Sequence, residues 1–220
     1  MSRRVGGLLR VAVVLSLVTA GLVFAAPAAQ AITFNLTSDH CTDGCGPAGT
    51  VFGTVTLTQN GTTVDVTVHL NSGFAFAKTG AADDQAFKFN MTGGPTLASI
   101  TVDAHTPALV AAAGAFNGDG TGDFGFGINC PSCGGGLSSA FTTDIVFHVA
   151  NATIANLTVP NNSGNVFVAD IGNTTTGATG PVDATVPTTV PEPATLLLLG
   201  TGFAGAAIAA RLRSLRRRPS

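Results

Sequence analysis

The chain has 220 residues, of which 45% are hydrophobic and only 10% charged, and its formal net charge is −2. This near-neutral total hides an uneven distribution, because eight of the ten basic residues lie in the two terminal segments. Residues 32–190 hold two lysines against eleven aspartates, a net charge of about −9. Such an acidic body argues against nucleic acid and anionic lipid as partners, and its length fits one domain with a sizeable core.

The N-terminal 31 residues have the organisation of a secretory signal peptide. Three arginines precede the apolar segment 11–26, and Ala29-Gln30-Ala31 supplies the small residues that signal peptidase recognises. We therefore expect residues 1–31 to be removed by cleavage after Ala31. The general secretory route is favoured over the twin-arginine route, because Gly6 and Gly7 stand where a twin-arginine signal carries bulky apolar residues. A glycine and a proline interrupt the apolar region, which argues against a permanent N-terminal anchor.

Residues 51–70 show the clearest β pattern, with alternating apolar and polar runs on either side of Asn60-Gly61. An Asn-Gly pair favours a two-residue type I′ turn, so the sequence predicts a hairpin folded at this pair. The predicted partners on the apolar face are Val51 with Leu70, Val55 with Val66, and Leu57 with Val64. The predicted partners on the polar face are Thr54 with Thr67, and Thr56 with Asp65.

Further short strands are expected where β-branched and aromatic residues stand between Gly, Pro, Asn and Ser. They are predicted at 74–76, 87–91, 100–102, 124–128, 145–149, 154–159 and 166–171. One helix is predicted at 107–115. The pattern predicts an all-β fold, an antiparallel β-sandwich or jelly-roll-like domain over residues 32–173. The Thr-, Gly- and Pro-rich segment 174–189 is interpreted as an extended linker.

Four cysteines form two close pairs, Cys41 with Cys45 and Cys130 with Cys133. In an exported protein an even number of cysteines indicates disulfides; three connectivities are open, and pairing within each close pair is favoured. The Cys-x-x-Cys motif is also found in thiol oxidoreductases, but the glycine run 134–136 that follows it denies the motif the helix N-terminus that this chemistry needs. A four-cysteine zinc site has sensible spacing, but an oxidising compartment disfavours it.

Residues 117–123 place oxygen-bearing side chains at alternate positions, with glycines between them. Calcium prefers six to eight oxygen ligands, and the glycines let a chain curl around the ion. The candidate ligands are Asn117, Asp119, Thr121 and Asp123. The segment is similar to the start of an EF-hand-type loop, but Ile128 stands where that loop has its bidentate glutamate. A glycine-rich polar turn between strands is therefore favoured over a calcium site, and no other cofactor is expected.

No catalytic constellation is evident in residues 32–190, and we expect the protein not to be an enzyme. The four histidines are scattered, and two of them, His69 and His148, are predicted to lie on the polar faces of strands. The segment has no glutamate, no nucleophile-elbow serine and no His-Glu-x-x-His motif. A glycosidase built on two aspartates is a weaker alternative. The absence of Trp and Tyr weakens a lectin interpretation, because carbohydrate sites favour these aromatic rings.

The last thirty residues have three consecutive parts. Val190-Pro191-Glu192-Pro193 leads into the uncharged segment 194–210, whose 17 residues are at the short end of what spans a bilayer as a helix. Five arginines follow, Arg211, Arg213, Arg216, Arg217 and Arg218. Because basic residues flanking a span stay in the cytoplasm, the sequence predicts a single transmembrane helix at 194–210 with the body of the protein outside.

This tail resembles the PEP-CTERM sorting signal of Gram-negative bacteria, which combines a Pro-Glu-Pro motif, a short hydrophobic helix and an arginine cluster. The resemblance covers residues 190–218 and nothing upstream. It implies that a membrane-embedded exosortase recognises Pro191, Glu192 and Pro193, cleaves nearby, and passes the protein from the inner membrane to the cell envelope or extracellular matrix. The alternative is that the tail remains as a permanent single-span anchor.

The sequence thus favours a noncatalytic exported protein of the cell surface or of an exopolysaccharide (biofilm) matrix. Its expected partners are signal peptidase, exosortase and the membrane that holds residues 194–210 before processing, with exopolysaccharide as a further candidate and nucleic acid excluded. The alternative function is a calcium-dependent carbohydrate-binding module or a weak glycan-acting enzyme.

Overall fold

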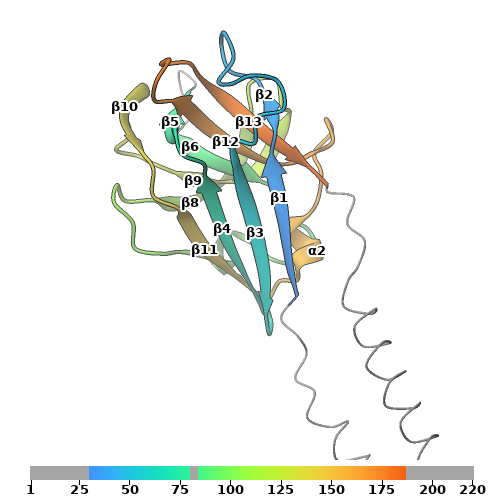
Figure 1. Ribbon diagram of the computed structural model, residues 1–220. Helices are drawn as coiled ribbons and strands as arrows, with labels where there is room; N and C mark the ends of the chain where they lie inside the picture. The colour runs from blue at the N-terminus through green and yellow to red at the C-terminus, as the bar shows by residue number, and fades with distance from the viewer. Residues whose placement is uncertain (1–29, 80–83, 187–220) are drawn as a thin grey trace, which may run out of the picture. The chain divides into compact units, whose positions relative to one another are not determined.

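The computed structural model describes residues 30–79 and 84–186, which form two antiparallel sheets packed as a sandwich (Figure 1). The smaller sheet has the strand order β1 (Ala31–Leu36), β3 (Gly53–Asn60), β4 (Thr63–Leu70), β11 (Ile145–Ala150), β7 (Ile100–Val102). The main path of the larger sheet is β10 (Gly136–Phe141), β5 (Phe74–Lys78), β12 (Asn165–Asn173), β6 (Gln85–Phe89), β9 (Asp123–Asn129), β8 (Val110–Asn117). Off this path, β13 (Thr179–Thr185) pairs with β12, and β2 (Ser38–Asp39) pairs with β13.

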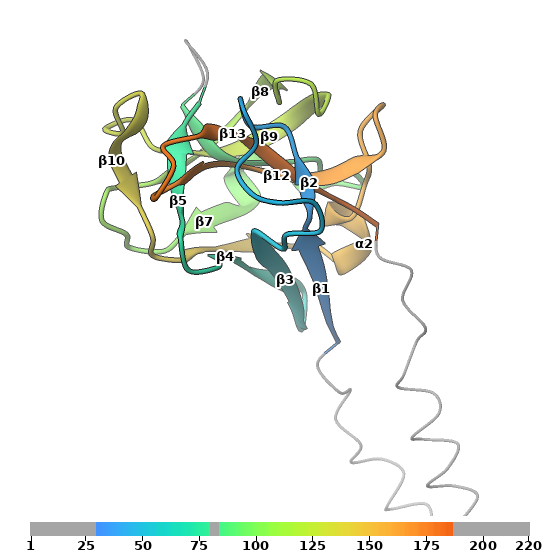
Figure 2. The same ribbon diagram turned by 45° about the horizontal axis from the view of Figure 1, so that its top comes forward.

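Phenylalanines hold the two sheets together. Figure 2 shows β3 and β4 of the smaller sheet on one side of the sandwich, and β12 and β13 of the larger sheet on the other. Between the sheets, Phe34 of β1 meets Phe167 of β12 edge-on, with ring centroids 4.9 Å apart. Phe147 of β11 lies 5.2 Å from Phe89 and 6.1 Å from Phe87, both on β6. All five rings are fully buried, and each such aromatic pair contributes about 0.5–1.5 kcal/mol beyond the area that it buries.

The β3–β4 hairpin is present, but its register differs from the predicted one by two residues. Val55 pairs with Val68 and Leu57 with Val66, and the turn consists of Gly61 and Thr62. The φ of Gly61 is +60°, which is typical of the first residue of a type II′ turn. A shift of two residues leaves the side chains within β3 and β4 on their predicted faces, because side chains alternate with a period of two. The predicted pair of Val51 with Leu70 is wrong: Val51 lies before β3 and is 38% exposed, and Gly53 is opposite Leu70. The apolar pattern therefore predicted the buried face correctly, whereas the choice of turn residues was wrong.

Two local predictions are wrong, one because a segment pairs as a strand and the other because a segment is capped as a helix. The alanine-rich segment predicted as a helix at 107–115 contains most of strand β8, which pairs with β9 along its length. Tertiary pairing has overridden the helical preference of alanine here. The predicted strand at 154–159 begins instead with a single helical turn, α2 (Ile154–Leu157). Thr153 and Asn156 form a capping box at its start, with the Thr153 N–H donating to Asn156 Oδ1 at 2.7 Å.

The segment interpreted as a linker belongs largely to the domain. Its residues 179–185 form β13, which lies between β12 and β2 and is mostly buried. Thr, Gly and Pro favour extended backbone, which suits a strand as well as a linker, so composition alone could not distinguish the two. The compact unit accordingly ends at Val186 rather than at residue 173. The other predicted strands are present as β5, β6, β7, β9, β11 and β12, and a short 3-10 helix, η1 (Leu97–Ser99), precedes β7.

Candidate functional site

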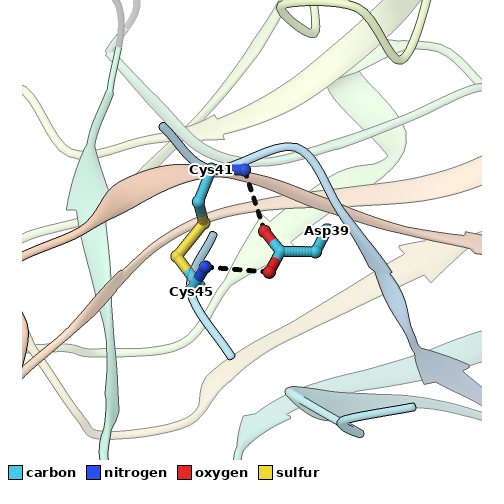
Figure 3. Close-up of side chains that lie close together, drawn as sticks. All are labelled: Asp39, Cys41 and Cys45. Atoms are coloured by element: carbon cyan, nitrogen blue, oxygen red, sulfur yellow. Dashed lines mark hydrogen bonds between the residues drawn. A yellow bond between two sulfur atoms is a disulfide. The ribbon is translucent and has the colours of Figure 1, made fainter. Parts of the chain in front are cut away.

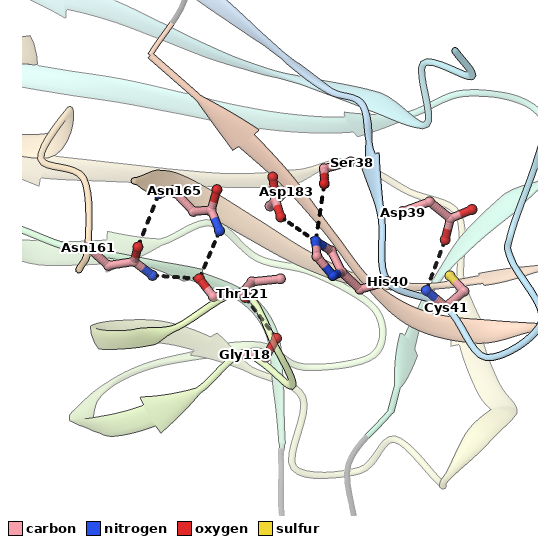
Figure 4. A network of polar contacts seen from close by, with 9 residues as sticks. All are labelled: Ser38, Asp39, His40, Cys41, Gly118, Thr121, Asn161, Asn165 and Asp183. Carbon is pink, nitrogen blue, oxygen red and sulfur yellow. Dashed lines mark hydrogen bonds and ion pairs between the residues drawn. The ribbon is translucent and has the colours of Figure 1, made fainter. Parts of the chain in front are cut away.

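The outer face of the larger sheet, which points away from the smaller sheet, carries a polar network around His40 (Figure 4). Asp183 of β13 lies opposite Ser38 of β2, so both side chains point to this face. The Nε2 atom of His40 lies 2.8 Å from Asp183 Oδ2 and 3.1 Å from Ser38 Oγ. The Asp183 side chain is only 3% exposed. Burial raises the pKa of the Asp183 carboxyl above its ordinary value, and its hydrogen bonds with His40 and Ser38 offset part of this rise.

This Ser, His and Asp set is arranged differently from a hydrolytic triad. In a triad the serine and the aspartate contact different nitrogens of the imidazole, so that the ring can take the serine proton while the aspartate orients it. Here Ser38 and Asp183 both contact Nε2 of His40. The arrangement therefore suits His40 as a hydrogen-bond partner of the buried Asp183 carboxylate rather than as a base that activates Ser38.

The Asn117–Asp123 loop, the sequence candidate for calcium, is the turn between β8 and β9 and lies beside this network (Figure 4). Its Thr121 is fully buried, and the Thr121 hydroxyl donates to the Gly118 carbonyl at 2.7 Å. The Thr121 carbonyl accepts hydrogen bonds from the side chains of Asn161 and Asn165, both at 2.8 Å. Both bonds attach the loop to the segment that leads into β12.

The other three candidate calcium ligands are exposed and take part in the turn. The Asp119 N–H donates to Asn117 Oδ1 at 2.7 Å, and the Asn117 amide donates to Asp123 Oδ1 at 3.2 Å. Asp119 has a φ of +45°, a conformation that Asp and Asn adopt more readily than most residues. These contacts describe a polar turn joining two strands, the favoured interpretation from the sequence. Calcium binding at this loop stays a prediction.

The Asp39 carboxylate accepts backbone hydrogen bonds from both cysteines of the first disulfide (Figure 3). Its Oδ1 atom accepts the Cys41 N–H at 2.9 Å, and its Oδ2 atom accepts the Cys45 N–H at 2.8 Å and the Gly46 N–H at 3.2 Å. The disulfide joins Cys41 to Cys45. The Asp39 carboxylate and the two sulfurs lie within 4.8 Å of one another, which is close enough for a metal site. However, both sulfurs are committed to the disulfide and offer no thiolate, so the group acts as a structural closure.

The second disulfide joins Cys130 to Cys133, directly after β9. The local pairing predicted for both cysteine pairs is therefore confirmed, and no cysteine is free. Cys133 N–H donates to the Cys130 carbonyl at 3.1 Å, so the Cys-x-x-Cys motif forms a tight turn rather than the start of a helix. This geometry lacks the helix N-terminus that lowers the pKa of a redox-active thiol.

His148 lies on the exposed face of the smaller sheet between two aspartates. Its Nδ1 atom is 2.7 Å from Asp65 Oδ1, and its Nε2 atom is 3.0 Å from Asp103 Oδ1. The hydrogen bond with Asp65 is the main cause that raises the pKa of His148; burial acts in the opposite direction and Asp103 adds to the rise. His69 lies on the same face and contacts Asp144 at 2.8 Å. The predicted placement of both histidines on polar faces is confirmed.

Sequence patterns did not indicate the partners of these histidines. Asp183 lies in the segment interpreted as a linker, 143 positions after His40, and nothing local links the two. The partners of His148 come from β4 and from the residue that follows β7. Cross-strand register would have identified Asp65, which lies opposite His148, but that register depends on which strands are neighbours.

The sequence candidates for export and sorting lie outside the described residues. They are residues 1–29 of the signal peptide predicted at 1–31, the motif Pro191, Glu192 and Pro193, the predicted transmembrane helix at 194–210, and the arginines 211, 213, 216, 217 and 218. Within residues 30–79 and 84–186, no helix is long and apolar enough to span a membrane.

Comparison with curated proteins finds no match, and comparison with solved structures finds none either. Comparison with protein families finds one: residues 189–218 match the PEP-CTERM protein-sorting motif. The match contains the Pro-Glu-Pro motif, the uncharged segment and the arginine cluster. Proteins with this motif are exported and sorted at the cell surface. The β-sandwich therefore belongs to a chain that ends in a PEP-CTERM protein-sorting motif.

Proposed function

We propose that the protein is a noncatalytic component of the cell surface or exopolysaccharide matrix, whose β-sandwich is displayed there after exosortase has processed the tail. The sorting motif at residues 189–218 carries this proposal. The two disulfides support it, because disulfides persist in the oxidising compartments that an exported protein enters. The body of the protein is acidic, which keeps such a domain soluble.

The arrangement of titratable side chains supports a noncatalytic role. His40 is bonded to the buried Asp183, and both ring nitrogens of His148 contact aspartates. A general base needs a nitrogen directed at a substrate proton. Both nitrogens of His148 are instead engaged with aspartates, and the Nε2 atom of His40 is shared between Ser38 and Asp183. Such contacts are expected of groups that stabilise a displayed domain.

Processing is tested by replacing Glu192 with Ala in the native host and determining the C-terminus by mass spectrometry. Wild-type protein from the envelope or matrix is expected to lack the arginines at 211–218, whereas the Glu192→Ala chain is expected to keep them and remain with the inner membrane. Arg218→Ala is the matched control in the same tail, since four arginines remain. Wild-type matrix protein that retained its arginine cluster would contradict processing and support a permanent anchor.

The noncatalytic role is tested separately with protein purified from the host matrix. We expect it to sediment with the host exopolysaccharide without generating new reducing ends during prolonged incubation. Release of reducing ends that stopped after paired Asp→Asn substitutions would overturn the noncatalytic assignment while leaving the sorting assignment intact.

A calcium-dependent carbohydrate-binding module is the second candidate. One observation favours it: the Asn117–Asp123 loop exposes three oxygen-bearing side chains, while Thr121 fixes the loop to the rest of the larger sheet. Calorimetric titration with calcium, followed by a glycan array with and without calcium, tests it. Binding that is lost in an Asp119→Asn, Asp123→Asn double variant would favour this function; calcium-independent behaviour throughout would remove it.

A further inference from the structure

Lys88 and Asp170 form a buried ion pair. Lys88 lies on β6 and Asp170 on the neighbouring strand β12, 82 positions further along the chain. The Lys88 Nζ atom lies 2.8 Å from Asp170 Oδ2, and each side chain is only 1% exposed. Lysine and aspartate are rarely buried to this extent. The chain has one other lysine, Lys78, which pairs with Asp84 where the two side chains are 24% and 41% exposed.

The cross-strand register brings the two groups together on the outer face of the larger sheet. Lys88 lies opposite Gly127 of β9 on one side and Val168 of β12 on the other. Asp170 is two residues after Val168, so its side chain points to the same face. Gly127 has no side chain, and the side chain of Gln85 fills the space that a Cβ atom would take there. The two charged side chains therefore lie next to each other on one face of the sheet, and the residues directly opposite Lys88 are small or apolar.

Burial changes the chemistry that is open to this pair. A low-dielectric environment disfavours both charged forms, so it favours transfer of a proton from the ammonium to the carboxylate. The products are a neutral amine, which is a nucleophile, and a carboxylic acid, whose carbonyl carbon is an electrophile. Holding two such groups in contact can correspond to effective concentrations of about 10⁵–10⁸ M when their orientation is suitable.

We propose that Lys88 and Asp170 condense to form an isopeptide bond inside the folded domain. The Lys88 Nζ attacks the Asp170 Cγ, a new N–C bond forms, and the C–O bond to the acid hydroxyl breaks. The hydroxyl leaves with one proton from the amine as water, so the reaction needs no oxidant, reductant or further substrate. The product ties β6 covalently to β12. This modification is independent of the function proposed above and would protect the domain outside the cell.

The two lysines make a tryptic digest decisive. The nearest arginines are Arg10 and Arg211, so trypsin can cut residues 32–190 only after Lys78 and Lys88. Full chain exported by the host is denatured, reduced, alkylated and digested. With the isopeptide bond in place, trypsin cuts after Lys78 but not after Lys88, and the fragment that begins at residue 79 is lighter by one water. Quantitative release of a free peptide 79–88 overturns the proposal, and cleavage after Lys78 is the internal control.

Chymotrypsin locates the bond. It cuts after Phe87 and Phe89, on both sides of Lys88, and after Phe167, three residues before Asp170. Tandem mass spectrometry is expected to find Lys88-Phe89 joined through Asp170 to the peptide that begins at Val168. A water loss located at Asp119-Gly120 instead would indicate a succinimide and overturn the assignment.

Two variants provide matched controls. Lys88→Arg keeps the positive charge and the tryptic site but lacks the amine, so it is expected to release residues 79–88 with no loss of water. Asp170→Asn is expected to lose one ammonia or to remain unlinked. Loss of water at Lys88 in the Asp170→Asn variant would contradict the proposal. The wild-type digest decides the question even if a variant fails to fold.

Discussion

The Nε2 atom of His40 lies 2.8 Å from Oδ2 of Asp183, although the two residues are 143 positions apart in the sequence. The contact joins the residue after β2 to β13, so the edge of the larger sheet is held by a side-chain bond as well as by backbone pairing. Because Asp183 is buried, its carboxylate would be costly to keep ionised without such a partner.

We therefore expect His40→Ala to lower the free energy of unfolding by about 1–3 kcal/mol at neutral pH, because a buried carboxylate loses a hydrogen-bond partner. The loss should shrink in acid, where Asp183 becomes protonated; since burial already raises its pKa, this occurs above the pH at which an ordinary aspartate is protonated. Urea unfolding at several pH values measures it. His69→Ala, in an exposed pair with Asp144, is the control and should change stability by about 0–1 kcal/mol. Equal losses in both variants would contradict the prediction.

The pKa of His148 is raised by Asp65 and Asp103, so this group binds its proton more tightly in the folded state than in the unfolded state. Its contribution to stability is fully present below the ordinary histidine pKa and is lost as the pH rises through the raised value. Wild-type protein is therefore expected to lose more thermal stability than His148→Gln as the pH increases from about 5 to 8. Melting temperatures of the two proteins across this range test it. If the two curves ran parallel, the contacts of His148 with the two aspartates would not make thermal stability depend on pH, and the prediction would be wrong.

Gly61 occupies the β3–β4 turn with a φ of +60°, and a Cβ atom at this position would have no neighbour within 4 Å. Gly61→Ala is thus expected to cost about 1–2 kcal/mol through backbone strain alone. Gly135 is the matched control, because it also has open space around it but no positive φ. Chemical denaturation of both variants distinguishes the causes. If Gly135→Ala were as destabilising as Gly61→Ala, the turn geometry would not explain the effect.

Asp39 accepts hydrogen bonds from three backbone N–H groups, those of the two cysteines of the Cys41–Cys45 disulfide and that of Gly46, the next residue. We expect Asp39→Ala to cost about 1–3 kcal/mol, since all three bonds are lost, and Asp39→Asn to cost less because one oxygen acceptor remains. Denaturation of both variants, combined with mapping of the disulfides under nonreducing conditions, measures the effect. A cost for Asp39→Asn as large as that for Asp39→Ala would mean that charge, rather than the number of acceptors, is decisive.

Features that depend on residues close together in the sequence could be predicted from it. The faces of the β3–β4 hairpin follow from an alternation with a period of two, and that alternation survives the two-residue error in register. The pairing of Cys41 with Cys45, and of Cys130 with Cys133, follows from short spacing in an exported chain. The sorting motif is likewise a linear signal, and its position at the C-terminus could be identified without any knowledge of the fold.

The sequence by itself therefore determined the buried faces of the hairpin, the local pairing of the cysteines and the sorting motif, because each depends on residues close together along the chain. The tertiary structure alone decided that residues 110–117 and 179–185 are strands, since their partners β9 and β12 supply the pairing that their composition does not specify. It also brought Lys88 to Asp170 across 82 positions. Contacts of this kind depend on strand order and register, which arise when the sheets assemble around a common core and have no counterpart in local sequence.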